Sequence, residues 1–204
     1  SLARNGRKAL RNPTPGENST PETLTERVAT GLALVSAKLP DSTGRWLLVD
    51  VVSQRILLLE DERVKDSWPV STAAAGLDNR QDSGGTPPGL HRVHRKIGAG
   101  AEQDMIFESR ELTGILWRRP AAGETDPTEG RDLILTRILS LAGQENGLNR
   151  GPGVDSLERY IYIHGTNRED RIGSPVSCGC VRMTNRDVVT LFDLVSEGDP
   201  VVII

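Results

Sequence analysis

The sequence is poor in cysteine, aromatic residues and long apolar runs. Two cysteines among 204 residues cannot build a disulfide framework. Aromatic residues make up 3% of the chain, which leaves Leu, Val, Ile and Ala to form the core. No apolar run approaches the roughly 20 residues that span a bilayer. The net charge of −3 provides no broad basic face, so we expect no nucleic-acid partner.

What is present is the composition of an ordinary soluble globular protein. Charged residues are 26% and hydrophobic residues 36% of the chain. A chain of this length can bury one domain with an appended segment. No signal peptide is visible, and we expect a monomer.

Residues 1–43 are expected to form a flexible leader followed by one helix. The first 20 residues are basic and lack periodic apolar positions. Thr20 is the expected N-cap, with Pro21 at the first helical position, and Pro40 ends the helix. One apolar face recurs at helical spacing through Leu24, Val28, Leu32, Val35 and Leu39.

Residues 44–204 are expected to form a mainly β domain with few helices. A second helix is expected near its end, running from Thr184 or Asn185 to Val195. Short apolar runs with branched side chains predict strands at 46–51, 56–59, 64–72, 90–97, 104–108, 133–141, 160–163 and 200–204.

A cysteine nucleophile with a histidine base is the first chemistry that the sequence suggests. Cys180 lies in the window from Ser177 to Met183, and His164 follows a short apolar run upstream. A thiol needs a nearby base to become a thiolate at neutral pH, and imidazole is the usual one.

The motifs around this pair resemble the L,D-transpeptidase catalytic domain (YkuD-type). The resemblance covers roughly residues 44–204. Its most specific segment combines several fixed residues at fixed spacing, and a Thr-Pro-x-Gly loop lies upstream. The matching residues are His164-Gly165-Thr166, Gly173-Ser174-Pro175, Ser177-x-Gly179-Cys180-Val181-Arg182-Met183-x-Asn185-x-Asp187, Gly198-Asp199-Pro200-Val201, Trp46 to Asp50, Gln54 to Leu57 and Ser83-x-x-Thr86-Pro87-x-Gly89.

The resemblance implies a β-sandwich-like catalytic domain, here with an N-terminal helical extension. It implies a cell-wall cross-linking enzyme of the periplasm or cell envelope that needs no cofactor. Such enzymes attack a peptidoglycan tetrapeptide stem before its terminal D-alanine and form a cysteine thioester. An amine of a neighbouring stem, or of a wall-anchored protein, then resolves the thioester.

The resemblance also assigns roles to individual residues. Cys180 would be the nucleophile and His164 its base and later acid. The backbone oxygen of Gly165 would orient the imidazole, and the backbone of Gly179 would form the oxyanion hole. Substrate contacts are expected at Arg182, Ser177, Cys178, Tyr162 and Asn185.

The chain departs from the family pattern at Cys178, where a histidine usually precedes the Gly-Cys pair. This substitution leaves the proposed nucleophile and base in place. It puts substrate positioning or thiolate stabilisation in question instead.

Other interpretations remain open. With water as acceptor the enzyme would be a carboxypeptidase, and an amidase acting on wall-bound protein is a related possibility. A turnover-deficient peptidoglycan-binding module is a third. Zinc held by His164, Cys178 and Cys180 lacks a fourth ligand, so we expect no metal site. His91 and His94 are expected to be surface or half-buried residues on opposite faces of one strand.

Overall fold

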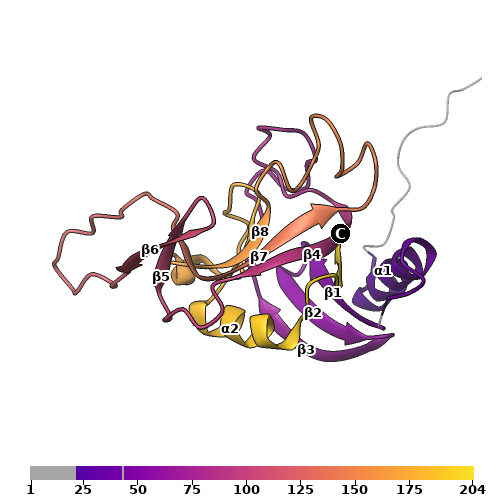
Figure 1. The fold of residues 1–204 in the computed structure, drawn as a ribbon, viewed down its shortest axis with the longest axis horizontal. Helices are drawn as coiled ribbons and strands as arrows, with labels where there is room; N and C mark the ends of the chain where they lie inside the picture. The colour runs from indigo at the N-terminus through magenta and orange to yellow at the C-terminus, as the bar shows by residue number, and fades with distance from the viewer. Residues whose placement is uncertain (1–21, 43) are drawn as a thin grey trace, which may run out of the picture.

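A computed structural model describes residues 22–42 and 44–204 (Figure 1). The predicted leader, with Thr20 and Pro21, lies outside these residues. The elements along the chain are α1 (Leu24–Lys38), β1 (Arg45–Asp50), β2 (Arg55–Glu60), β3 (Arg63–Pro69), β4 (Gly89–Ile97), β5 (Met105–Glu108), β6 (Glu111–Leu116), β7 (Ile134–Gly143), β8 (Tyr162–Thr166), the 3-10 turn η1 (Glu169–Arg171), β9 (Val181–Met183), α2 (Asn185–Leu194) and β10 (Pro200–Ile203).

The strands form one ten-stranded, mostly antiparallel sheet, so the predicted mainly β fold is confirmed. The order along the main path is β3-β2-β1-β10-β4-β7-β5-β6. Strand β8 pairs with β7 on one side and, in parallel, with β9 on the other. The closing strand β10 inserts between β1 and β4, and it thereby joins the first hairpin to the rest of the sheet.

Strand β1 is apolar from Trp46 to Val49, as expected for a strand with both faces buried. Leu47 and Val49 point into the main core, which α2 closes. Trp46 and Leu48 point to the opposite face, where α1 packs. The two helices therefore cover different faces of the sheet (Figure 1).

Helix α1 begins later than predicted. Thr23, not Thr20, is the N-cap, and it forms a capping box with Glu26. The glycine inside this helix has a packing reason, because a Cβ on Gly31 would lie 2.8 Å from the ring of Trp46. Glycine lets the helix approach the indole closely, which outweighs its low helix propensity. Neither described helix has the length and apolar character needed to span a bilayer.

Most predicted strands are confirmed, including the run at 133–141, which corresponds to β7. Strands β6 and β9 were not predicted. Strand β6 is largely exposed and is interrupted by Gly114, so it carries no apolar alternation. Strand β9 has three residues, too few to show a period.

The expected exposure of His91 was wrong. Its side chain is fully buried, and its ring nitrogens lie 3.0 Å from Gly89 O and 2.9 Å from Ser156 Oγ. Burial lowers the pKa of His91 to about 4, so the ring is neutral at pH 7. His94 is exposed, as expected.

A buried ion pair ties α1 to the sheet. Arg27 Nη2 lies 3.0 Å from Asp50 Oδ2, and both side chains are largely buried. We expect Arg27→Met to lower the free energy of unfolding by about 3 kcal/mol, because it leaves a buried carboxylate without its counter-charge. Urea unfolding measures this, with Arg186→Met as the exposed control. Equal stabilities of the two variants would contradict the prediction.

Candidate active site

Parallel pairing of β8 with β9 brings the predicted base and nucleophile together. His164 on β8 is in register with Arg182 on β9, and Cys180 directly precedes β9. The backbone N–H of Tyr162 donates to Cys180 Sγ at 3.4 Å. Tyr162 and His164 are two residues apart on one strand, so their side chains share a face of the sheet.

The imidazole of His164 is held by its own strand. Its Nδ1 lies 2.7 Å from the carbonyl oxygen of Gly165, and the side chain is 1% exposed. A carbonyl oxygen only accepts hydrogen bonds, so Nδ1 carries the proton and Nε2 presents a lone pair. Burial lowers the pKa of His164, although Asp132 and the Gly165 carbonyl act in the opposite direction. The ring is therefore neutral and able to accept a proton.

The thiol of Cys180 rests in its neutral form. Its Sγ donates to Tyr160 O at 3.3 Å and packs beside the apolar cluster that contains Tyr162 and Ile138. Burial is the main factor that raises the pKa of Cys180 to about 11, partly opposed by the N–H of Tyr162. Among the described residues, no hydrogen bond joins this thiol to His164.

Hydrogen bonds fix the turn before Cys180. Ser177 Oγ donates to Cys180 O at 2.6 Å and accepts from the N–H of Gly179 at 3.2 Å. The hydroxyl of Thr86, from the upstream Thr-Pro-x-Gly loop, donates to Gly179 O at 3.0 Å and accepts from Ala73 N–H. Gly179 has a φ of +126°, which side chains rarely adopt. Internal hydrogen bonds therefore hold the conformation of this turn and use most of its polar groups.

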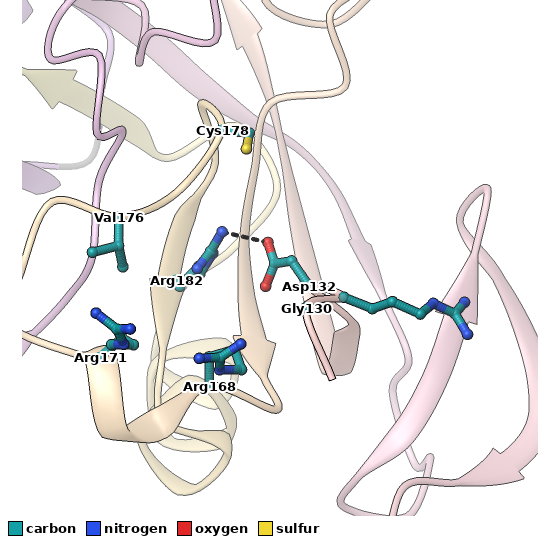
Figure 2. Close-up of a pocket in the computed structure, with 8 residues that line it drawn as sticks. Gly130, Asp132, Arg168, Arg171, Val176, Cys178 and Arg182 are labelled. Atoms are coloured by element: carbon teal, nitrogen blue, oxygen red, sulfur yellow. Dashed lines mark ion pairs between the residues drawn. The ribbon is translucent and has the colours of Figure 1, made fainter. Parts of the chain in front are cut away.

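Arg182 lines a cavity of about 280 Å³ beside this turn (Figure 2). Its side chain is 6% exposed, and its Nη2 lies 2.6 Å from Asp132 Oδ2. Exposed Cys178 lines the same cavity, so the residue that replaces the family histidine faces a space that a ligand can enter. The sequence offered no signal for Asp132.

Asn185 lies beneath the base and is fully occupied by internal bonds. Its side chain accepts from Thr136 Oγ1 and donates to Thr166 O and Glu169 Oε1. A Cβ on Gly165 would lie 2.3 Å from Asn185 Oδ1, so only glycine fits there. Asn185 thus supports the strand that carries His164.

Arg110, from the turn between β5 and β6, was missed from the sequence. Its Nε donates to the hydroxyl of Tyr162 at 2.6 Å, and its Nη2 donates to Leu157 O at 3.1 Å. The guanidinium lies 4.5 Å from the ring centre of Tyr160. It therefore fixes both tyrosines whose backbone groups contact Cys180 Sγ. A lone arginine in a polar turn gives no sequence signal for such a role.

The structure offers no donor set for the zinc alternative. Within residues 22–42 and 44–204, no three His, Cys, Asp or Glu side chains are grouped so that they could hold a metal ion.

A comparison with protein families shows which family the chain belongs to. The sequence model of the YkuD family, the L,D-transpeptidase catalytic domain, matches residues 44–203. The chain belongs to this family. The resemblance seen in the motifs is confirmed, and the matched region of this transpeptidase domain contains His164 and Cys180.

Individual relatives agree with the family match. The domain is 28% identical over 167 residues to "Probable L,D-transpeptidase ErfK/SrfK" of Escherichia coli (strain K12), covering 81% of this chain and 46% of that protein. Three Bacillus relatives match over 26% to 30% of their length. The chain thus spans less than half the length of the curated relatives it matches.

Two solved structures are similar at lower identity. An L,D-transpeptidase from Mycobacterium smegmatis is 18% identical with a TM-score of 0.46, covering 79% of this chain and 58% of that one. L,D-transpeptidase 3 from Mycobacterium tuberculosis, in complex with a faropenem-derived adduct, is 18% identical with a TM-score of 0.47, covering 78% and 60%.

The raised pKa of Cys180 predicts how the free transpeptidase domain reacts with iodoacetamide. Only the thiolate is alkylated, so the rate at Cys180 should rise about tenfold per pH unit from pH 7 towards its pKa of about 11. Intact mass of the Cys178→Ala variant reports this rate, and circular dichroism checks the fold at each pH. A rate that levels off below pH 9 would instead reveal a thiolate stabilised at rest.

The hydroxyl of Thr86 should be needed for the stability of the turn before Cys180. Thr86→Val leaves Gly179 O and Ala73 N–H without their partner, which should cost about 1–3 kcal/mol in the free energy of unfolding. Thr86→Ser keeps the hydroxyl and is the matched control in urea titrations. If valine is tolerated better than serine, the hydrogen bonds are not what the position requires.

Proposed function

We propose that this chain is a peptidoglycan L,D-transpeptidase of the cell envelope, acting in the periplasm or at the wall. It forms a thioester between Cys180 and a tetrapeptide stem and transfers the stem to an amine. The observation that carries the proposal is the placement of a neutral, oriented imidazole on the sheet face that holds the thiol.

That placement follows from strand register. His164 lies opposite Ile138 in the antiparallel β7–β8 pair, so both side chains are on one face. Ile138 belongs to the apolar cluster against which Cys180 packs. Since Nδ1 of His164 is engaged by Gly165 O, the free Nε2 is the atom that would take the thiol proton.

The reaction then proceeds in two balanced steps. In the first, the sulfur of Cys180 attacks the carbonyl carbon of the third stem residue while His164 takes the thiol proton. The C–N bond to D-alanine breaks, and His164 returns the proton to the departing amine. In the second, an acceptor amine attacks the thioester carbonyl carbon and loses a proton to His164, the C–S bond breaks, and His164 returns the proton to the sulfur.

The neighbouring residues support these steps. We assign the oxyanion site to the backbone around Gly179, where the N–H shared with Ser177 Oγ would be one donor. Tyr162 contributes its backbone N–H to the sulfur, and Asn185 supports the strand of the base. Arg182 and Cys178 line the cavity that would receive part of the stem.

The high resting pKa of Cys180 sets a condition on this chemistry. Because the thiol is neutral and its proton is donated to Tyr160 O, substrate binding has to turn Sγ away from that carbonyl and towards the imidazole. Proton transfer and attack would therefore be concerted with substrate placement.

The test is incubation of the reduced protein with purified disaccharide-tetrapeptides, followed by intact-mass and product analysis. We expect an acyl adduct that lacks D-alanine, formed by wild type and Cys178→Ala and absent from Cys180→Ala. Cross-linked dimers should accumulate as product. His164→Ala should lower the acylation rate by about 100-fold or more, since general acid–base catalysis contributes at least this much.

The products also separate the other candidate activities. Free tripeptide without dimers would mean that water is the acceptor, which makes the protein a carboxypeptidase. Transfer only to added protein amines would indicate action at wall-anchored protein. Muropeptide binding without any adduct would contradict the proposed enzyme and favour a binding module.

A further inference from the structure

Half of the residues that line the cavity beside the turn before Cys180 are arginines. Arg131, Arg168, Arg171 and Arg182 border it, and Asp132 is its one acidic lining residue. In Figure 2, Cys178 lies on one side of the Arg182–Asp132 pair, and Arg168 and Arg171 lie on the other. We call this space the arginine pocket.

Two of these guanidinium groups, those of Arg168 and Arg171, share a single carboxylate, that of Asp170. Asp132 is engaged by Arg182 at 2.6 Å, which neutralises that pair. Arg168 and Arg171 approach Asp170 only at 3.8 Å and 3.7 Å, beyond hydrogen-bonding distance. The pocket therefore keeps positive charge that its own residues do not neutralise.

The backbone that carries these two arginines is fixed. Arg168 caps the start of the 3-10 turn η1 and Arg171 is its last residue, and Arg171 N–H donates to Arg168 O at 2.9 Å. Ser71 Oγ donates to Arg171 O at 2.7 Å, and Thr166 Oγ1 accepts from Arg168 N–H at 3.0 Å. The guanidinium groups are thus presented from an ordered turn, which lowers the entropic cost of binding.

Charge distinguishes the arginine pocket from its neighbour. The adjacent cavity, which Arg168 also borders, is lined by Glu124, Asp126, Glu129 and Asp170. Those carboxylates repel an anion. An anionic group is therefore expected to settle in the arginine pocket, where planar guanidinium groups can hold a carboxylate through two parallel hydrogen bonds.

The arginine pocket also lies within reach of an acyl group on Cys180. Cys178 and Arg182, two residues before and two residues after Cys180, both line it. A stem peptide bound at the sulfur has residues on either side of the attacked bond. A side-chain carboxyl group of one of them could enter the arginine pocket beside Cys178.

We propose that the arginine pocket is a carboxylate subsite, in which Arg168 and Arg171 distinguish stem peptides with a free side-chain carboxyl group from stems in which that group is amidated. This assignment rests on the proposed function, because it takes the stem peptide as the ligand. An amide carries no charge, and an NH2 donor replaces one of the two carboxylate acceptors. A guanidinium group has no acceptor for that donor.

The test compares two synthetic tetrapeptide stems that differ only in this carboxyl group, free in one and amidated in the other. Calorimetry measures their affinity for the Cys180→Ala protein, so binding is read without turnover. We expect the free form to bind about tenfold or more tightly, as for a charge-assisted pair. Adding Arg168→Gln and Arg171→Gln should remove the preference. Arg63→Gln, an exposed arginine on the edge strand β3, should retain it.

Each result is decisive. An unchanged preference in the double variant, or an equal loss of affinity for both peptides, would overturn the subsite. A preference that depends on these arginines, found in a protein whose wild type forms no thioester, would uphold the subsite and refute the proposed function. Thioester formation without any preference between the two peptides would support the proposed function and overturn the subsite.

Discussion

The parallel contact between β8 and β9 is the constraint on which the site depends. In this pairing the strand that carries His164 lies beside the strand that follows Cys180, and His164 is in register with Arg182. This register alone sets which side chains share a face with the sulfur. Glycine at position 165 leaves the room that the side chain of Asn185 occupies beside this strand. A shift by one residue would turn the imidazole into the apolar core.

The polar groups near the sulfur divide into two kinds. Those of Ser177, Thr86 and Asn185 are used inside the protein, where they hold the turn and the strand of the base. The guanidinium groups of Arg168 and Arg171 share one carboxylate, Asp170, at 3.8 Å and 3.7 Å and make no hydrogen bond to it. Rigidity and recognition are therefore carried by different residues, and a change in substrate preference need not disturb the reactive geometry.

The sequence predicted the elements whose apolar period was long enough to read, such as the first hairpin and β7, and its motifs predicted the family. It could not predict three-residue β9 or exposed β6. The burial of His91 depends on Ser156, a partner distant in sequence, so a local pattern misses it. Arg110 and Asp132 were missed for the same reason, since each acts through a contact that only the folded chain creates.

The neutral resting state of Cys180 has a consequence for durability. Oxidants and electrophiles attack thiolates much faster than thiols, so a sulfur whose pKa is about 11 is chemically quiet while it waits. Its bond to Tyr160 O adds to this protection. Exposed Cys178, two residues away, is the sulfur that peroxide would reach first.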